Sequence, residues 1–364
     1  MNKVKFAIIG CGRIAKNHVK AAIDNAESMQ LVAVCDIIKE NAIEKATQYA
    51  EGHRAQPSVY VDYKEMLEKE EIDAVTICTE SGYHPEIAIY SMNQGKHVIT
   101  EKPMALSVED ADAMIHAGQA NRVKLCVSHQ NRFNPPIQKL REAVEKGRFG
   151  RLIAGNARIL WNRNQGYYSQ APWRGTYQLD GGCLMNQCIH NIDLLQWMLG
   201  GDIDWVNGAV GNFMHDYIAA EDYGSIQLGL KEGIIGNVEG TVCVYPTNLE
   251  ETLTIMGEKG IVAIGGVAVN KIETWRFADG LDTEEEVMTL CNGEVESVYG
   301  NGHTPLYRDF IDAIENDRKP YIDGKDGKIA MQIILAAYKS SMEGRRISWE
   351  KDCSYLKAID GGVR

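Results

Sequence analysis

Val4-Lys5-Phe6-Ala7-Ile8-Ile9-Gly10-Cys11-Gly12-Arg13-Ile14-Ala15 is the stretch from which the architecture of this 364-residue chain can be worked out. Residues 4–9 form an apolar run typical of a buried strand, and residues 10–15 match G-x-G-x-x-G/A before an expected helix over 13–26. Glycines in such a turn let the backbone approach a pyrophosphate, which then binds at the helix N-terminus. The stretch therefore predicts a dinucleotide-binding strand–turn–helix unit.

The next expected strand, over 31–35, is followed by Asp36, which lies 21 residues beyond Ala15. An acidic side chain at this distance can bind both ribose hydroxyls of a dinucleotide. Its charge would repel the 2′-phosphate of NADP, and Ile37 supplies no compensating cation. We therefore expect NAD as the cofactor rather than NADP. The alternative, a glycine turn and a surface aspartate without a ligand, is disfavoured by the strand–helix context. The residues expected to bind NAD in this region are Gly10, Gly12, Arg13, Ile14 and Asp36.

Strand-like and helical segments alternate through the first third of the chain. Further strands are expected at 74–78, 97–100 and 124–127, and helices at 39–50, 63–69, 85–94 and from Ser107 onward. Strands separated by helices indicate βαβ units and a parallel sheet. We expect an NAD-binding domain over 1–128.

The pattern changes after Asn134-Pro135-Pro136. A helix near 136–147 precedes a strand over 152–160, and residues 205–290 read as strands separated by glycine and asparagine turns. Such a stretch is typical of a mostly antiparallel sheet. Helices are expected near 304–316 and 326–343. The fold class is therefore α/β, with a second, substrate-binding domain over 129–364.

The composition limits the partners. A net charge of −12 argues against bulk binding to nucleic acid or to an acidic membrane. No apolar run is long enough to span a membrane, and the first one is too short for a signal peptide. Nine cysteines occur without a C-x-x-C pair or metal-like spacing, which suits a reducing cytosol. We expect a cytoplasmic protein that binds a small molecule and no metal.

Glu101-Lys102-Pro103 follows the expected strand 97–100. In open α/β sheets, ligands bind outside the carboxyl ends of the strands. Removal of a hydride from a secondary alcohol must be matched by removal of the hydroxyl proton, which requires a base whose pKa is near neutrality. Burial and a nearby positive charge lower the pKa of a lysine. Lys102 is therefore a candidate base, although a solvated strand-end charge is the alternative.

Thr79 lies in the loop after the preceding strand, and this loop is expected to pass under the cofactor. His84 is a weaker candidate for contact with the cofactor, because a histidine at a helix start is often a local cap.

A second polar cluster lies between Asp180 and Asp193. The segment after Gly182 is helical in pattern as far as Leu199, and at 3.6 residues per turn Asn186, His190 and Asp193 share one face. Asp193 could orient the imidazole of His190. His190 is therefore a second candidate for acid–base chemistry, and a satisfied core histidine is the alternative.

Together, the glycine turn, Glu101-Lys102-Pro103 and Gly181-Gly182…Asn186…His190 resemble the Gfo/Idh/MocA oxidoreductase family over nearly the whole chain. The resemblance implies an N-terminal Rossmann domain and a C-terminal α/β domain with an open, mostly antiparallel sheet that often forms oligomers. A homodimer or homotetramer is the expected assembly. It also implies catalytic roles for Lys102 and His190 and a frequently cis Lys102–Pro103 bond. Members often have aspartate where this chain has Asn186, so Asn186 is expected to position rather than to exchange a proton.

Within the family, residues 161–168 and 171–176 resemble bacterial UDP-N-acetylglucosaminuronate 3-dehydrogenases, which oxidise the sugar C3 hydroxyl with NAD during surface polysaccharide biosynthesis. The resemblance implies that Trp173 and Arg174 pack near the nicotinamide. It also adds Glu101, Lys102 and Gln130 to the residues expected to bind the cofactor. Arginine binds carboxylates and phosphates bidentately. The residues expected to bind substrate are Lys102, Arg158, Arg163, Tyr167, Tyr168, Asn186 and His190.

Other interpretations stay open at this point. The substrate could be another sugar or an inositol, or the chain could be an NAD-dependent glycosidase of the same family. For each arginine a surface ion pair is the alternative, and for the two tyrosines ordinary packing. A non-catalytic NAD-binding regulator is the least favoured reading, because Lys102 and His190 are both present.

Overall fold

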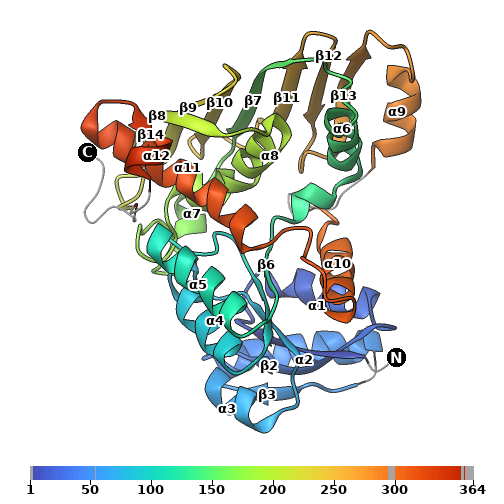
Figure 1. The fold of residues 1–364 in the computed structure, drawn as a ribbon. Coiled ribbons are helices and arrows are strands. Elements are labelled where there is room, and N and C mark those ends of the chain that lie inside the picture. The colour runs from blue at the N-terminus through green and yellow to red at the C-terminus, as the bar shows by residue number, and fades with distance from the viewer. Residues whose placement is uncertain (1–2, 54, 294–299, 354–355, 357–364) are drawn as a thin grey trace. The chain divides into compact units, whose positions relative to one another are not determined.

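The computed structural model describes residues 3–53, 55–293, 300–353 and 356 (Figure 1). The chain forms two compact units. Unit 1 consists of Met1–Ala105, Glu109–His129 and His303–Lys328, and unit 2 consists of Leu106–Val108, Gln130–Gly302 and Ile329–Arg364. Helices and strands occur in both, which confirms the α/β class.

Unit 1 contains a six-stranded sheet in the order β3-β2-β1-β4-β5-β6, and each neighbouring pair is parallel. The strands are β1 (Val4–Ile9), β2 (Met29–Cys35), β3 (Ser58–Tyr60), β4 (Ala74–Ile77), β5 (His97–Thr100) and β6 (Leu125–Val127). The order reverses between β1 and β4, which is the position where doubly wound sheets bind ligands. The parallel Rossmann sheet expected from the sequence is confirmed.

Gly10 shows why this sheet needs its glycine turn. Its φ is +89°, and a Cβ at this position would lie 2.6 Å from the backbone carbon of Cys78. Any side chain here would collide with the residue that follows β4. The turn after β1 can therefore lie against the end of β4 only because residue 10 is glycine.

The helices of unit 1 are those expected, with one addition from late in the chain. They are α1 (Ala15–Asp24), α2 (Lys39–His53), α3 (Tyr63–Lys69), α4 (His84–Asn93), α5 (Val108–Ala120) and α10 (His303–Glu315), together with a short 3₁₀ turn, η1 (Ser81–Tyr83). Helix α10 packs on α1, where Asn25 Nδ2 donates to the Thr304 carbonyl at 3.0 Å. A single cut after residue 128 therefore does not reproduce the compact units, because residues 303–328 return to the first one.

Unit 2 contains an eight-stranded sheet in the order β13-β12-β11-β7-β10-β9-β8-β14. The strands are β7 (Leu152–Leu160), β8 (Ile203–Gly211), β9 (Tyr223–Leu230), β10 (Ile235–Thr241), β11 (Glu250–Gly257), β12 (Gly260–Gly265), β13 (Lys271–Phe277) and β14 (Ile347–Ser348). Only β7 and β10 pair in parallel, so the sheet is mixed and mostly antiparallel, as expected.

One part of the expected strand region is helical instead. Helix α9 (Glu284–Cys291) lies within 205–290. Thr283 Oγ1 accepts from the Glu286 backbone N–H at 3.3 Å, and Glu286 Oε2 accepts from the Thr283 backbone N–H at 2.8 Å. This reciprocal capping box is a strong helix-start signal, so the expectation of continuous strands to residue 290 was wrong.

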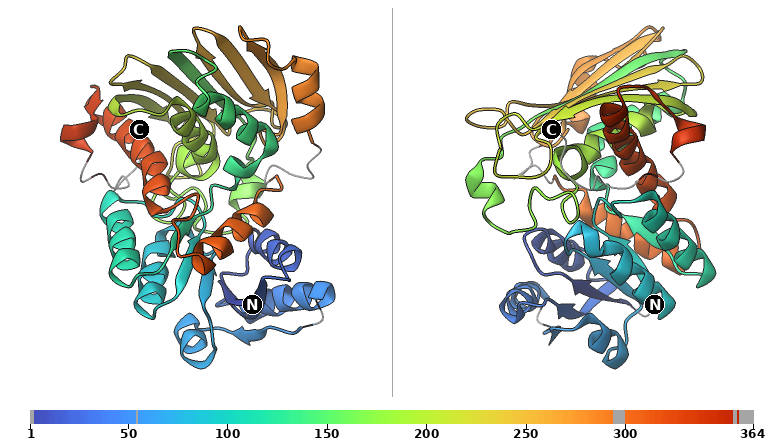
Figure 2. Two further views of the ribbon diagram at one scale, coloured as in Figure 1. Left: turned by 45° about the vertical axis from the view of Figure 1, so that its right-hand side comes forward. Right: turned by 90° about the vertical axis from the view of Figure 1, so that its left-hand side faces the viewer.

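Helices cover one face of the unit 2 sheet (Figure 2). The covering elements are α6 (Pro135–Glu145), a π-helical turn η3 (Leu184–Cys188), α8 (Ile189–Leu199) and α11 (Gly324–Glu343). Gly155 and Gly208 mark the close packing, because a Cβ at either would lie 2.6 Å from Leu195 or Ala337. The opposite face carries polar side chains such as Asn156, Gln227 and Asn237. The second view in Figure 2 shows no helix over that face.

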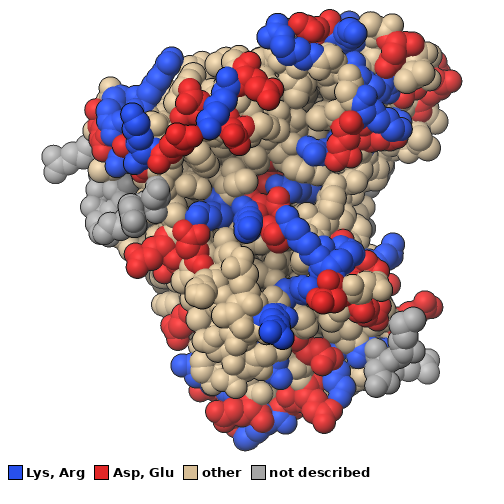
Figure 3. Space-filling model, viewed as in Figure 1, with Lys and Arg blue, Asp and Glu red and all other residues tan. Residues whose placement is uncertain are grey.

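The surface is mixed in charge. Acidic and basic side chains alternate over most of the face drawn in Figure 3. Within the described parts of the chain, none of the helices has both the length and the apolar character that crossing a bilayer requires.

Candidate active site

The glycine turn of unit 1 is shaped for a dinucleotide. A Cβ at Gly12 would meet no atom within 4 Å, so the backbone there faces open space. Helix α1 begins at Ala15, and the residue before it, Ile14, provides no side-chain cap. A helix N-terminus of this kind favours a phosphate. Gly10, Gly12, Arg13 and Ile14 form the turn before it, and their binding of the NAD pyrophosphate stays a prediction.

Asp36 connects the end of β2 to this turn. Its Oδ2 accepts from the Cys11 backbone N–H at 2.7 Å, and its Oδ1 accepts from the Ile38 backbone N–H at 2.8 Å. The neighbouring Ile37 is 86% exposed and brings no positive charge. This arrangement fits the ribose of NAD and opposes a 2′-phosphate.

Lys102 follows β5 at the carboxyl edge of the sheet, and the Lys102–Pro103 bond is cis, as the family resemblance implies. Its backbone N–H donates to Glu101 Oε2 at 3.2 Å. The positive charge of Lys102 acts on two histidines of unit 1: burial lowers the pKa of both His84 and His303, and the charge of Lys102 lowers each further. The side chain therefore lies among titratable groups.

The His84 ring contacts two loops of unit 1, one after β5 and one after β4. One ring nitrogen lies 2.8 Å from the Pro103 carbonyl oxygen and the other 3.0 Å from the Thr79 carbonyl oxygen. The ring is 1% exposed. These contacts favour a positioning role for His84 over direct contact with NAD. Thr79 itself stays half-buried in the loop after β4.

The Glu101 side chain lies in the interior of unit 1. The residue is 6% exposed, and Oε1 lies 3.0 Å from His18 Nε2. This position favours a structural role for the carboxylate, and binding of the cofactor by Glu101 stays a prediction.

In unit 2, Tyr167 is the centre of a polar cluster. Its hydroxyl accepts from Arg174 Nη1 at 2.6 Å and from Gln187 Nε2 at 3.0 Å. The guanidinium carbons of Arg174 and Arg163 lie 4.4 and 5.3 Å from the centre of its ring. Trp173 contributes a second ring, 4.5 Å from the Arg174 guanidinium. The structure thus brings four of the predicted ligand-binding residues together, and Gln187, which was not predicted, joins them through Tyr167 and Arg163.

The two arginines of this cluster lack anionic partners. Arg163 donates to Gln187 Oε1 at 3.0 Å and to the Asn162 carbonyl at 2.7 Å. Within the described residues, no carboxylate oxygen lies within 4.0 Å of either guanidinium. The charge of Arg163 acts on buried Glu251, whose pKa burial raises to about 8. Among the described residues, neither guanidinium of the cluster therefore has a carboxylate at ion-pair distance.

Asn186 is held by a carboxylate that the sequence analysis did not single out. Asn186 Nδ2 donates to Asp180 Oδ1, and Asp180 Oδ2 accepts from the Gly175 backbone N–H at 2.7 Å. Asp180 is 3% exposed. Its place six residues before Asn186 in a glycine-rich stretch was the available sequence signal. The contact supports a positioning role for Asn186.

The helix that carries Asn186 and His190 is irregular. Residues 184–188 form a π-helical turn, and His190 is the second residue of α8. The expectation of a regular α-helix through Asn186 was therefore wrong, because the wider turn shifts the phase before α8. His190 and Asp193 lie three residues apart within α8, where such a spacing keeps them on one face. Turns of the π-helical kind occur often at functional sites.

Asp193 has a strong partner. Both its oxygens accept from Arg132, at 2.7 and 2.6 Å, and both side chains are 1% exposed. The Arg132 guanidinium also stacks on Trp197, 4.7 Å from the ring centre. Asp193 therefore anchors α8, and its role in orienting His190 stays a prediction.

The surroundings of three further predicted residues are those of an ion pair or of the protein interior. Arg158 pairs with Glu239 at 3.0 Å and Glu250 at 2.8 Å on the open face of the sheet, which favours a surface ion pair over substrate contact. Tyr168 is 9% exposed and packs against Tyr167, so packing accounts for it. Gln130 is buried, and its Oε1 has no hydrogen-bond partner within the described residues.

A further buried acid went unnoticed in the sequence. Glu221 accepts from the Leu184 backbone N–H at 2.8 Å and from the Tyr338 hydroxyl at 2.7 Å, at the start of the π-helical turn. Burial raises its pKa to about 8. No local pattern marks a glutamate that only tertiary packing buries.

The comparison with protein families agrees with this geometry. Residues 4–129 match the model "Oxidoreductase family, NAD-binding Rossmann fold", and residues 137–263 match "GFO/IDH/MocA C-terminal domain". The chain belongs to the Gfo/Idh/MocA oxidoreductase family. It is an NAD-dependent dehydrogenase of a family whose members act on sugars and polyols.

Solved structures and sequence relatives point to different substrates. The WlbA dehydrogenase of Bordetella pertussis, solved with NADH and UDP-GlcNAcA, is 37% identical, with a TM-score of 0.87 over 95% of this chain and 98% of that one. Its counterpart from Chromobacterium violaceum, with the same ligands, is 36% identical, with a TM-score of 0.86 over 97% of each chain. Myo-inositol 2-dehydrogenase of Thermotoga maritima is 26% identical over 96% of this chain and 99% of that protein.

Proposed function

We propose that this enzyme oxidises the C3 hydroxyl of UDP-N-acetylglucosaminuronate with NAD, in the biosynthesis of a bacterial surface polysaccharide. The observation that carries the proposal is the pair Arg163 and Arg174, both stacked on Tyr167 and neither paired with a carboxylate in the described structure. Higher identity to two UDP-GlcNAcA-bound dehydrogenases than to an inositol dehydrogenase supports it.

The electrostatic argument separates charged from neutral substrates. Arg163 and Arg174 are both half-buried, and two guanidinium groups near one ring repel each other, which an anion bound between them would relieve. A UDP-uronate brings a carboxylate and two phosphates, and arginine binds both kinds of group bidentately. An inositol is neutral and would leave the cluster uncompensated. An inositol dehydrogenase is therefore the second candidate, supported only by the sequence relatives.

The proposed roles follow from residue chemistry. Bound NAD accepts the hydride from the carbinol carbon. Lys102 takes the hydroxyl proton as general base, and His190 is the second acid–base group. Asn186, held by Asp180, cannot exchange a proton and orients the sugar by hydrogen bonding. Arg163, Arg174 and Tyr167 hold the anionic parts of the substrate.

A substrate panel tests this proposal. Purified enzyme with NAD is offered UDP-N-acetylglucosaminuronate, UDP-N-acetylglucosamine, UDP-glucuronate and myo-inositol, and reduced nicotinamide is followed by absorbance. We expect the highest kcat/KM with the first compound. Reduction with myo-inositol alone would replace the proposal by the second candidate. Release of an aglycone from a glycoside without net NADH would support the glycosidase reading.

Variants of Arg163 and Arg174 test whether these two residues bind the substrate. We expect Arg174→Ala and Arg163→Ala each to raise KM for the UDP-uronate by about 10–100-fold, the value of a lost charge-assisted hydrogen bond. Arg151→Ala is the matched control, because Arg151 is an exposed residue paired with Glu258 at 3.1 Å. Unchanged KM in both cluster variants would remove the basis of the assignment.

We also propose that the enzyme is a homo-oligomer that associates through the open face of the unit 2 sheet. Gln227 Nε2 donates to Asn237 Oδ1 at 3.2 Å, and Asn237 Nδ2 donates to Asn156 Oδ1 at 3.1 Å, forming a polar row across three strands. Light scattering gives the assembly. Arg158→Glu, which would repel Glu239 and Glu250, should weaken it, and a monomeric wild-type protein would refute it.

A further inference from the structure

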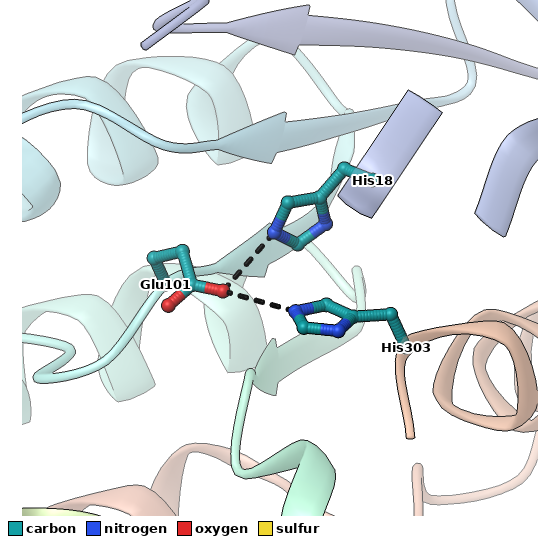
Figure 4. Close-up of side chains that lie close together, drawn as sticks. All are labelled: His18, Glu101 and His303. Atoms are coloured by element: carbon teal, nitrogen blue, oxygen red, sulfur yellow. Dashed lines mark hydrogen bonds and ion pairs between the residues drawn. The ribbon is translucent and has the colours of Figure 1, made fainter. Parts of the chain in front are cut away.

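Glu101 belongs to a buried chain of polar side chains in unit 1 (Figure 4). His18 Nε2 lies 3.0 Å from Glu101 Oε1, and His18 Nδ1 lies 3.0 Å from the Tyr307 hydroxyl. That hydroxyl lies 2.7 Å from Thr76 Oγ1. Every member is buried, with 0% exposure for His18 and Thr76. The chain joins α1, β4, the end of β5 and α10.

The donors and acceptors in this chain can be assigned. An ionised carboxylate only accepts, so His18 Nε2 carries the hydrogen that Glu101 receives. With His18 neutral, its Nδ1 accepts from the Tyr307 hydroxyl, and Tyr307 in turn accepts from Thr76. Each hydrogen bond then has one donor and one acceptor. The network is therefore satisfied with Glu101 as the anionic end.

A second histidine, His303, also lies beside the Glu101 carboxylate. Its Nε2 lies 3.7 Å from Glu101 Oε1, and its ring meets that of His18 edge-on at 4.9 Å. Burial alone would raise the pKa of Glu101, but its interactions with the His18 and His303 rings outweigh burial and hold the pKa well below its usual range. A charge at this depth is costly unless it serves a partner.

We propose that Glu101, held ionised by His18 and His303, is a positioning residue that fixes the backbone of Lys102 and sets the ionisation of its side chain. The Lys102 backbone N–H donates a hydrogen bond to Glu101 Oε2 at 3.2 Å. A buried anion one residue away favours protonated Lys102 in the absence of NAD. The cationic ring of bound NAD would oppose this, so the lysine would become a base when the cofactor binds. This inference rests on the proposed role of Lys102 as the base.

Other titratable groups face the same carboxylate. They are Cys78 at the end of β4, His84 at the start of α4, and Tyr307 on α10. Burial raises the pKa of the Cys78 thiol and of the Tyr307 hydroxyl well above their usual values, so both are neutral at physiological pH. Glu101 is therefore the group among them that carries negative charge.

His18, Glu101 and His303 also offer three ligand atoms close enough for a metal ion. The positive charge of Lys102, which acts on His303, disfavours a second cation there. The 3.0 Å separation between His18 Nε2 and Glu101 Oε1 is that of an ordinary hydrogen bond. Metal analysis of the purified protein decides the point: stoichiometric metal that is lost in His303→Ala would overturn the hydrogen-bonded assignment.

The decisive experiment measures Lys102 directly. An amine-selective acylating reagent is applied across a pH series without NAD, and modification of the Lys102 peptide is followed by mass spectrometry. In Glu101→Gln we expect the midpoint of Lys102 modification to move about one pH unit lower, since a nearby opposite charge is removed. An amide fits this network, because Tyr307 and Thr76 can both reverse their roles as donor and acceptor. An unchanged midpoint would overturn the proposal.

Two further variants separate the effect of the Glu101 charge from the effect of the hydrogen-bond network. Tyr307→Phe breaks the network but keeps the anion, so the thermal midpoint should fall while the pH midpoint of Lys102 modification stays unchanged. An equal shift of the Lys102 midpoint in Tyr307→Phe and Glu101→Gln would show that Glu101 acts only structurally. Glu101→Asp keeps the charge and should keep the Lys102 midpoint. If Glu101→Gln does not fold, the wild-type protein is still informative: a Lys102 midpoint well below that of exposed Lys325 would contradict the proposal.

Activity measurements distinguish two hypotheses: that Lys102 is the general base, and that Glu101 sets its ionisation. The pH dependence of kcat/KM should show its acid limb at lower pH in Glu101→Gln, in step with the labelling. Full turnover by Lys102→Ala would refute Lys102 as the base and leave the labelled coupling between Glu101 and Lys102 intact.

Discussion

Asp193→Asn should destabilise the protein strongly, although it changes one atom. The substitution keeps the size of the side chain and removes its charge, so the Arg132 guanidinium stays buried without a counter-ion. Both groups are 1% exposed, and the two hydrogen bonds measure 2.7 and 2.6 Å. Breaking such a buried pair costs about 3–5 kcal/mol. At about 2–4 °C per kcal/mol for a unit of this size, the thermal midpoint should fall by about 6–20 °C.

Calorimetry and near-ultraviolet circular dichroism measure this shift, and Glu258→Gln is the matched control. Glu258 pairs with Arg151 at 3.1 Å on the surface, where both side chains are exposed. Loss of an exposed pair costs about 0–1 kcal/mol. A thermal midpoint in Asp193→Asn no lower than in the control would refute the assignment of this pair as the anchor of α8.

The same variant tests the link between the anchor and His190, which lies three residues earlier on α8. If Asp193 only anchors the helix, kcat measured well below the transition should keep its pH profile. If Asp193 orients the imidazole, the pH limb that belongs to His190 should move. The comparison therefore separates a structural carboxylate from a catalytic one.

Three further predictions follow from single contacts. The pKa of Glu221 rises from 4.5 to about 8 on folding, so its proton is bound more tightly in the folded state and the free energy of unfolding should fall as pH rises through that interval. Because Glu251 has the same raised pKa, Glu221→Gln should reduce this slope in urea titrations without abolishing it; an unchanged slope would exclude Glu221 as a source. Asp36→Ser should raise KM for NAD about 10–100-fold and weaken the preference over NADP, and retained discrimination would assign it to another residue. Arg158→Ala, which breaks only the pairs with Glu239 and Glu250, should leave KM for substrate unchanged; a rise would restore Arg158 to the substrate site.

The sequence predicted unit 1 well, because its signals are local. Alternating apolar strands and helices, the turn at Gly10 and the acidic residue after β2 each depend on residues close together in the chain. The return of α10 to unit 1 could not be predicted in this way. It depends on contacts such as His18 with Tyr307, which are 289 residues apart. The buried partners of Glu101 could not be predicted for the same reason, since they come from α1 and α10.

Arg158 and Arg163 show most clearly what local patterns leave undecided. They lie five residues apart and carry the same charge, and the sequence offers no reason to separate them. Arg158 lies on β7, where strand register places it beside Glu239 and Glu250, 81 and 92 residues away. Arg163 lies beyond the end of β7, where its partners are neutral amides and a carbonyl. Arg163 and Arg174 lie over the same tyrosine ring, and neither has a carboxylate within ion-pair distance among the described residues. Their shared location is therefore a stronger indication of an anionic substrate than any motif.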